Sequence, residues 1–395
     1  MSGMNFLERL LDGVAVEWKP LGEIGELVRG NGLPKTDFTE SGVPAIHYGQ
    51  IYTYYGLSTT STKSFVSPET ATKLRKVDKG DVVITNTSEN FEDVGKALVY
   101  FGDQQAVTGG HATIFKPCKN ILGKYFAYFT QTVVFKSEKR KYAKGTKVID
   151  VSATDMAKIP IPIPCPENPE KSLAIQAKIV RILDTFTALT AELTAELTDR
   201  KKQYNYYRDR LLTFEKGEVE WKTLGEVYKF QYGMGNTIPT LGGEYPVYGS
   251  NGIVGTHNEF NSEDSPVIGH IGAYAGIVNW GAGKHFVTYN GVICKLINKL
   301  VHPKYAYYQL LKQDFNSMAK SASHPFVSYD ALNKVSVPIP PPAEQARIVA
   351  ILGKFDTLTT SIREGLPREI ALRQKQYEYY RDLLLTFPKP KEIEA

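Results

Sequence analysis

Cysteine is scarce in this sequence of 395 residues, and the three cysteines lie far apart. Cys118, Cys165 and Cys294 form no C-x-x-C pair, so neither a disulfide framework nor a thiolate metal site is indicated. We interpret them as buried reduced thiols. No run approaches the roughly 18 apolar residues of a membrane span, and the N-terminal residues lack the layout of a secretory signal. We therefore expect a cytoplasmic protein.

The excess of charge of one sign is also small, with 47 Lys and Arg against 42 Asp and Glu. The net charge of +5 at pH 7 is too small to identify a nucleic-acid binder by itself. Residues 136–147 contain six Lys or Arg and one acidic residue, a run typical of a solvated face or of a phosphate-binding surface. Tyrosine is frequent, with 24 Tyr against 3 Trp, and a ring with a hydroxyl suits interfaces that are partly apolar and partly wet.

Catalytic motifs are missing as well. The sequence has no G-x-x-x-x-G-K-[ST] loop, no H-E-x-x-H pair and no G-x-S-x-G elbow. Residues 281–285 come nearest to a phosphate loop but lack its length and its hydroxyl, so we predict a hairpin turn there. Residues 30–35 place Pro34 where a dinucleotide loop would begin a helix. The methyl-donor loop of methyltransferases is absent too. We therefore expect no catalytic residue, no metal and no cofactor in this chain.

Self-similarity, in contrast, is abundant, and it suggests two repeated units. Residues 200–214 recur as 373–387, both with K-Q-Y-x-Y-Y-R-D followed by L-L-T-F. Residues 175–183 recur as 344–352, both with Q-A-[KR]-I-V-x-I-L. The second copy contains four more residues between these two motifs.

Each unit also begins and ends alike. The start V-E-W-K-x-L-G-E occurs at 16–23 and at 219–226, and proline ladders occur at 158–164 and 334–342. Proline in alternate positions excludes a helix or a central strand, so we expect extended edge or polyproline connectors that end each domain.

Between start and ladder, the pattern predicts a mixed α/β domain made mainly of strands and loops. Short β-branched and aromatic runs predict strands at 81–84, 97–101, 266–268 and 291–294. Apolar residues at steps of three and four predict helices near 124–134 and 303–318.

After each ladder, apolar residues recur at steps of four and three, as in a coiled-coil seam. The first seam runs from Ile175 to Leu211 and contains two tandem T-A-E-L units at 190–197. The second runs from Ile348 to Leu384 with one additional four-residue step, which we interpret as a stutter. Gly365 and Pro367 predict a bend or break in the second helix. The two seams most simply bury each other as an antiparallel pair.

Together these features resemble the specificity subunit of type I restriction-modification systems, with the IC subgroup as the best match. The resemblance rests on the paired W-K-x-L-G-E starts, the ladders, the Q-x-x-I-V-x-I-L and Y-x-Y-Y-R-D motifs and the T-A-E-L units. It implies a mixed α/β fold with two similar target recognition domains, held apart by two long antiparallel coiled-coil helices in a pseudo-twofold repeat. The boundaries we expect are 1–171 and 215–342 for the recognition domains, 172–214 and 343–388 for the long helices, and 389–395 for a flexible tail.

The resemblance also implies a function. Each domain would read one half of a split, asymmetric target in double-stranded DNA, without catalysis by this chain. Two modification subunits would methylate adenine with S-adenosylmethionine, and up to two restriction subunits would add ATP- and magnesium-dependent translocation and cleavage. Two alternatives stay open: a stand-alone two-domain DNA endonuclease, and a coiled-coil assembly protein that does not bind DNA.

Polar, glycine-bordered loops supply the candidate DNA contacts, from base edges or from the backbone. In the first domain they are Lys35, Thr36, His47, Tyr48, Gln50, Asn86, Ser88, Asn90, His111, Lys144, Thr146 and Lys147. In the second they are Asn236, Ser250, Asn251, His270, Tyr274, Tyr289, Asn290, Ser321, Ser323 and His324. Residues 109–111 align with 288–290, which makes these our preferred pair of reading positions. Candidates for docking the modification subunits are Tyr204, Tyr206, Tyr207, Tyr377, Tyr379 and Tyr380.

Overall fold

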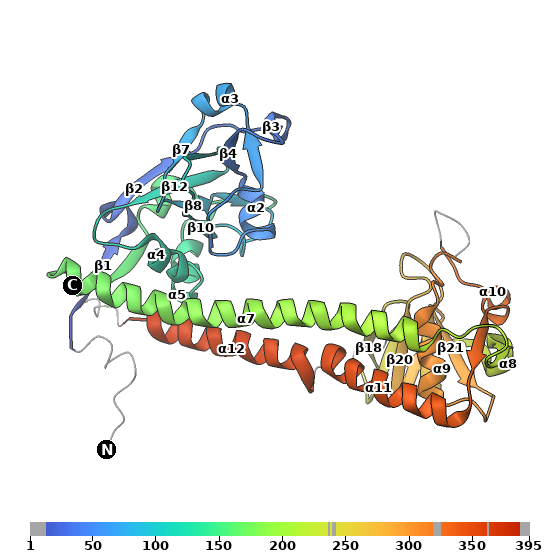
Figure 1. The fold of residues 1–395 in the computed structure, drawn as a ribbon. Helices are drawn as coiled ribbons and strands as arrows, with labels where there is room; N and C mark the ends of the chain where they lie inside the picture. The colour runs from blue at the N-terminus through green and yellow to red at the C-terminus, as the bar shows by residue number, and fades with distance from the viewer. Residues whose placement is uncertain (1–12, 236–237, 239–241, 319–324, 362, 388–395) are drawn as a thin grey trace, which may run out of the picture. The chain divides into compact units, whose positions relative to one another are not determined.

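The computed structural model describes residues 13–235, 238, 242–318, 325–361 and 363–387. The chain divides into two compact units, one of Met1–Glu192 with Ala371–Ala395 and one of Leu193–Ile370 (Figure 1). The longest helix, α7 (Pro169–Leu211), is unbroken and contributes residues to both units. Within the described ranges, no helix combines the length and the apolar character needed to cross a membrane.

Two five-stranded sheets form most of the first unit. Their strands are β2 (Gly25–Arg29), β3 (Phe38–Thr39), β4 (Val43–Ile46), β5 (Ser58–Thr59), β6 (Ser64–Val66), β7 (Arg75–Val77), β8 (Val82–Thr85), β10 (Ala97–Tyr100), β11 (Ala106–Thr108) and β12 (Ala112–Pro117). The orders are β2-β12-β8-β10-β5 and β3-β6-β4-β11-β7. Both sheets are mixed, because β10–β5 and β11–β4 are parallel pairs. A separate short ladder joins β9 (Thr87–Ser88) to β13 (Ile149–Asp150).

Short helices pack on both sheets, and the main buried core lies between the first sheet and the helices that cover it. The helices are α2 (Tyr48–Thr53), α3 (Pro68–Lys73), α4 (Gly123–Phe129), α5 (Val133–Arg140) and α6 (Ala153–Met156), with 3-10 turns at Leu21–Glu23 and Lys35–Asp37. Every residue of β8 and β10 is buried, and so are the last five residues of α4. We predicted one helix near 124–134, but the structure has two, α4 and α5. The second begins after Thr132, whose hydroxyl accepts a hydrogen bond from the amide of Phe135 at 3.2 Å and so caps α5.

One six-stranded sheet forms the centre of the second unit. Its strands are β16 (Tyr228–Tyr232), β17 (Tyr245–Gly249), β18 (Gly252–His257), β19 (Ser262–Gly269), β20 (Val278–Val287) and β21 (Gly291–Leu296), in the order β16-β21-β19-β20-β17-β18. The helices are α8 (Leu224–Val227), α9 (Pro303–Lys312), α10 (Tyr329–Asn333), α11 (Pro342–Thr360) and α12 (Gly365–Leu385), of which α12 continues into the first unit. The four strands predicted from sequence all occur, within β8, β10, β19 and β21.

In both units the start motif pairs with the proline ladder. β1 (Val16–Pro20) pairs antiparallel with β14 (Pro160–Pro164), and β15 (Glu220–Thr223) pairs likewise with β22 (Ser336–Ile339). Opposed residues in such a pair alternate between hydrogen-bonded and non-bonded positions. The prolines of the paired strands, at positions 160, 162, 164 and 338, fall at the non-bonded positions, so no ladder bond is lost. The connectors predicted to be extended are therefore strands that close each unit.

A tyrosine repeats the same contact with both ladders. Tyr125 donates its hydroxyl to the carbonyl oxygen of Pro162, and Tyr305 donates to that of Pro338, each at 2.9 Å. Both tyrosines are fully buried on α4 and α9. The hydrogen bond satisfies a carbonyl that the ladder leaves free, and it fixes the helix of each domain to its closing strands.

A buried glutamine joins the long helix of each unit to its domain. Gln176 accepts a hydrogen bond from the amide of Leu122 at 2.9 Å and donates to the carbonyl of Asn120 at 2.9 Å. Gln345 accepts from the amide of His302 at 2.7 Å and donates to the carbonyl of Leu300 at 3.2 Å. Both side chains satisfy backbone groups just before α4 or α9, where a helix start leaves amides unpaired.

Aromatic rings then pack the long helices together. In the first unit Phe186 of α7 stacks on Tyr380 of α12, with ring centroids 5.3 Å apart. In the second, Phe355 of α11 stacks on Tyr207 of α7 at 5.7 Å. The end of α12 shares a core with the start of α7, which confirms antiparallel packing within the first unit, as Figure 1 shows.

The second long helix is broken, as Gly365 and Pro367 predicted. The chain leaves the helix after Thr360 and re-enters it at Gly365. Gly365 has a φ of +82°, and a Cβ there would lie 2.5 Å from the carbonyl oxygen of Thr357. The additional four residues of this copy therefore lie between two helices, and the predicted stutter within one helix is wrong.

Two further predictions differ from the structure. Residues 281–285 lie inside β20 and form no hairpin turn, since the strand continues beside a bulge in β19 between Glu263 and Ser265. Cys165 and Cys294 are buried as expected, but Cys118 is exposed because it follows the end of β12.

We predict that Gln345→Ala lowers the free energy of unfolding by about 2–4 kcal/mol, because the substitution leaves the amide of His302 and the carbonyls of Leu300 and Pro340 without their partner. Urea unfolding followed by tryptophan fluorescence would measure it. Gln374→Ala is the control, since Gln374 is exposed on α12 and bonds to Glu378 one turn away. Equal stability of the two variants would contradict the role of Gln345.

Candidate nucleic-acid interface

The preferred reading positions occupy the same strand junction in the two units. The carbonyl of His111, just before β12, accepts from the amide of Asn86 at 2.8 Å. The carbonyl of Asn290, just before β21, accepts from the amide of His270 at 2.8 Å. The structure therefore supports the alignment of 109–111 with 288–290 as one position of a shared scaffold.

A glycine at the same position makes each junction possible. Gly30 donates to the carbonyl of Ala112 at 2.9 Å, and Gly233 donates to that of Gly291 at 3.0 Å. A Cβ at either position would lie 2.1 Å from a backbone oxygen of the facing loop. Gly30 and Gly233 thus allow two loops to approach closely beside each candidate residue.

In the first unit the junction carries an aromatic cluster. The ring of Tyr48 lies 4.6 Å from the ring of His47 and 4.8 Å from that of His111. His111 bonds through Nδ1 to the Thr87 hydroxyl at 2.7 Å. Burial lowers the pKa of His47, with smaller effects from the charges of Lys35 and His111. Four predicted residues, Lys35, His47, Tyr48 and His111, therefore come together.

Several other candidates of the first unit have internal partners. Asn86 is buried and accepts from Thr113 at 2.8 Å, while Ser88 lies in the β9–β13 ladder. Gln50 donates to Ser64 at 2.6 Å, and Asn90 holds a turn through Asp93. These side chains shape the loops, whereas Thr36 is exposed beside Asp37.

The predicted basic run serves several purposes. Lys144 forms an ion pair with Asp155 at 3.0 Å, and Thr146 and Lys147 are exposed at the tip of the adjoining turn. Lys139 is buried, donates to the carbonyls of Phe91 and Val94, and has its pKa lowered to about 8 by burial. The run is therefore only partly a solvated face.

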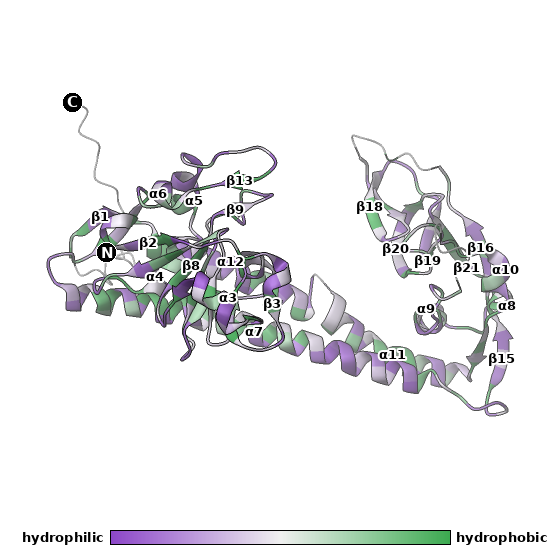
Figure 2. Cartoon of the chain, turned by 90° about the horizontal axis from the view of Figure 1, so that it is seen from above, coloured by the Kyte–Doolittle hydropathy of each residue, from purple (hydrophilic) through white to green (hydrophobic). Residues whose placement is uncertain are grey.

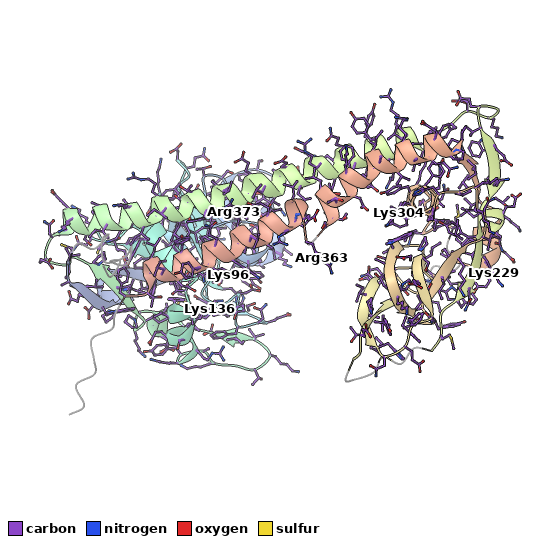
Figure 3. The ribbon with its side chains drawn as sticks, turned by 90° about the horizontal axis from the view of Figure 1, so that it is seen from below. Lys96, Lys136, Lys229, Lys304, Arg363 and Arg373 are labelled. Carbon is purple, nitrogen blue, oxygen red and sulfur yellow. The ribbon has the colours of Figure 1, made fainter. Side chains whose placement is uncertain are left out.

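A basic cavity of about 360 Å³ lies next to this run and was missed from sequence. Lys96, Lys136, Lys139 and Arg381 are among its lining residues, and Lys96 and Lys136 are labelled in Figure 3. Lys96 and Lys136 form ion pairs with Asp93 and Glu92, each at 2.7 Å. Arg381 lies more than 200 residues further along the chain than the three lysines, so the sequence gives no sign that it lines the same cavity.

In the second unit the junction carries a different cluster. The His270 ring lies 4.3 Å from that of Tyr232 and 5.6 Å from that of Tyr289, and Tyr329 stacks on Tyr232 at 4.0 Å. His270 is buried and its Nδ1 lies 3.0 Å from the carbonyl oxygen of Val327. Tyr232 and Tyr329 were not predicted as site residues, because aromatic residues in a strand or at the start of a helix usually belong to the hydrophobic core.

The remaining candidates of this unit divide by exposure. The Ser250 hydroxyl connects two loops, since it lies 2.8 Å from the carbonyl oxygen of Ile271 and 3.0 Å from that of Asn290. Asn251, Tyr274 and Tyr289 are exposed. Four predicted residues lie outside the described residues: Asn236, Ser321, Ser323 and His324.

The pattern of two similar domains agrees with a family of known proteins. The family model "Type I restriction modification DNA specificity domain" matches residues 14–200 and 216–372. The specificity subunit of the type I restriction enzyme EcoR124I/EcoR124II from Escherichia coli is 39% identical over the whole of both chains. The chain belongs to this family.

Other comparisons agree. The EcoprrI specificity subunit from Escherichia coli is 35% identical over 92% of this chain and 93% of its own. The crystal structure of a type I specificity subunit from M. genitalium has the same fold, with a TM-score of 0.59, 16% identity and coverage of 96% and 98%. A second solved structure, from work on complex assembly of the type I system, has a TM-score of 0.62 at 15% identity, covering 94% of this chain and 97% of that one.

Family membership decides among the functions left open by the sequence. The chain is a specificity subunit, a DNA-recognition component without catalytic activity, with a mixed α/β fold in which the family domain occurs twice. The endonuclease and the pure assembly protein are not supported. In the described part of the chain, no three His, Cys, Asp or Glu side chains gather in a way that could hold a metal ion.

The helix tyrosines of this specificity subunit fall into three equivalent pairs. Tyr204 and Tyr377 are buried within their own units, so they cannot dock a partner as placed. Tyr207 and Tyr380 are half-buried in the stacks already described. The third pair, Tyr206 and Tyr379, is 59% and 64% exposed.

His270 predicts a pH dependence of stability in the second unit. Burial lowers its pKa below the usual value of about 6.5, so the unfolded chain takes up the proton more readily. The contribution of His270 to stability is then fully present well above pH 6.5 and is lost as the pH falls through about 6.5 towards 5. His270→Gln should show a smaller fall in melting temperature over this range. Equal slopes for both proteins would contradict the prediction.

Proposed function

We propose that this specificity subunit reads a split DNA target, one half with each unit, at the junctions that carry His111 and Asn290. The observation that supports this most is the equivalence of the two junctions, with the same backbone hydrogen bonds and different side chains. A shared scaffold with different readers suits two half-sites of different sequence.

The chemistry of the junction side chains suits duplex DNA. His111, Tyr48 and Asn290 offer hydrogen-bonding groups for base edges, and amides such as Asn290 can bond adenine with two hydrogen bonds. Lys35 and Lys147 are exposed and suit phosphate contacts, which give affinity without sequence preference.

The proposal is tested by mapping methylated adenines after co-expression with the modification subunit. His111→Ala should weaken or relax one half-site, by roughly 5- to 150-fold in binding, and Asn290→Ala the other half-site. Asn120→Ala is the control, because Asn120 is exposed beyond the opposite end of β12. Variants that leave both half-sites unchanged would overturn the assignment of these junctions.

We also propose that two modification subunits dock on the long helices, with up to two restriction subunits joining the complex. Tyr206 and Tyr379 support this, because they are exposed at equivalent positions, and Arg210 lies within 3.4 Å of the Tyr206 hydroxyl. In this proposal S-adenosylmethionine, ATP and magnesium are bound by the partner subunits, and this chain supplies DNA reading alone.

Tyr206→Ala with Tyr379→Ala should weaken assembly with the modification subunit, since exposed aromatic rings often carry binding energy at interfaces. Native mass measurement of the co-purified complex would report the stoichiometry. Tyr54→Ala is a matched control, because Tyr54 is equally exposed, at 59%, on the recognition domain. An unchanged stoichiometry would count against the helix tyrosines.

The tandem T-A-E-L units at 190–197 predict a ruler. They lie within the unbroken α7, and one added unit lengthens a helix by about 6 Å and rotates the downstream part of the helix by about 40°. A base pair advances about 3.4 Å along DNA. The insertion should lengthen the spacer between half-sites by one or two base pairs and leave both half-site sequences unchanged.

Methylation mapping with one, two and three units would check the ruler. A constant spacer in all three proteins would show that the scaffold absorbs each insertion as a local bulge. A one-residue insertion is the control, because it disrupts the seam far more than four residues do.

A further inference from the structure

The described residues at the junction end of the second unit carry almost no charge. Residues 249–252, 269–276, 287–291 and 325–329 contain no Asp, Glu, Lys or Arg. Beside them Ile253 and Val254 are 63% and 47% exposed, although both lie in a strand. Figure 2 colours part of β18 as hydrophobic. Exposed apolar side chains clustered in this way mark a binding surface.

These residues line a groove of about 460 Å³. Asn251, Ile253, Val254, Tyr274 and Asn290 are among its lining residues. It therefore combines two aliphatic side chains, one exposed ring and two amides, and it joins the junction of Asn290 to the tip of the β17–β18 hairpin.

The backbone around the groove is tightly fixed. The Ser250 hydroxyl bridges the hairpin tip to the loops at Ile271 and Asn290. A Cβ at Gly269 would lie 2.6 Å from the carbonyl oxygen of Ser250, so these two loops are in close contact. The hairpin tip and the loops that border the groove are thus fixed to one another by these contacts.

The first unit presents a different surface at the same junction. Lys35 lies close enough to His47 to lower its pKa, and Arg29 bonds to the carbonyl of Gly110 at 3.2 Å and pairs with Asp150 at 3.6 Å. Cationic side chains suit phosphates, whereas none of the described residues that line the groove of the second unit is charged. A ligand of that groove must be recognised by its shape, its methyl groups and neutral hydrogen bonds.

Building on the proposed function, we infer that this groove receives the 5-methyl groups of thymines in the half-site read by the second unit. Thymine is the one base that presents a methyl group in the major groove, and apolar side chains contact it there. Ile253 and Val254 supply those contacts. Asn251 and Asn290 also line the groove, and an amide side chain can bond the N6 and N7 of adenine, the partner of thymine.

Replacement of thymine by uracil tests the inference, because uracil keeps the base pairing and lacks only the methyl group. The full chain, co-purified with its modification subunits, is titrated with duplexes of the mapped target at one fixed salt concentration. Uracil at a contacted thymine of the second half-site should raise Kd about fourfold, the value of one buried methyl-sized group. Uracil in the first half-site should leave Kd unchanged.

Variants assign the effect to the groove. Ile253→Ser with Val254→Ser should abolish the difference between thymine and uracil. Ile297→Ser is the control, because Ile297 is 53% exposed beyond the opposite end of β21. It should keep the fourfold difference.

Three results would overturn the inference: equal Kd for thymine and uracil throughout the second half-site, a mapped second half-site without any A·T pair, or a double variant that keeps the difference. If the double variant loses its modification subunits but still distinguishes uracil, the groove is a protein interface. Failure of the wild-type complex to bind any duplex would instead count against the proposed function itself.

Discussion

One buried amide in each unit is the contact on which the rest of the architecture depends. Gln176 and Gln345 each bond to the backbone just before a domain helix, and that helix carries the tyrosine that bonds to the closing strands. Helix, recognition domain and ladder are therefore linked through a few directional hydrogen bonds between buried side chains and the backbone. Such bonds are costly to leave unmade, so they fix orientation more strictly than apolar packing does.

The two units keep this frame while their cores diverge. At equivalent positions the first unit has Gly25 and Phe115, and the second has Tyr228 and Cys294. A Cβ at Gly25 would lie 2.4 Å from the Phe115 ring, so the large residue of each pair needs a small one opposite. When a larger side chain on one strand is matched by a smaller one on its neighbour, the packing density is kept although the sequence changes. This explains why the repeat is obvious in the helices and faint in the domains.

The sequence predicted the parts of the fold that follow from local pattern. The helix seams, the four strands and the break at Gly365 were all visible in periodicity, glycine and proline. The pairing of start motif with ladder was not, because strand partners far apart in the chain leave no local signal. The additional residues after Thr360 were misread for a related reason, since only the structure shows whether an insertion stays in a helix or leaves it. For the site, four residues of the first junction come together as expected. Tyr204 and Tyr377, in contrast, were predicted to contact partner subunits, and the structure buries both within their own units.

The closing ladder has a consequence for how such a protein changes. Because β1 pairs with β14 and β15 pairs with β22, the chain enters and leaves each domain at one place. Everything between those two strands can be exchanged as a block, whereas Gln176, Gln345 and the helix seam lie outside the block. Recombination within the short repeated segments that encode these strands would then yield a new reader on an intact frame. In such a lineage, new DNA targets would arise by exchange of whole domains more readily than by gradual change of single contacts.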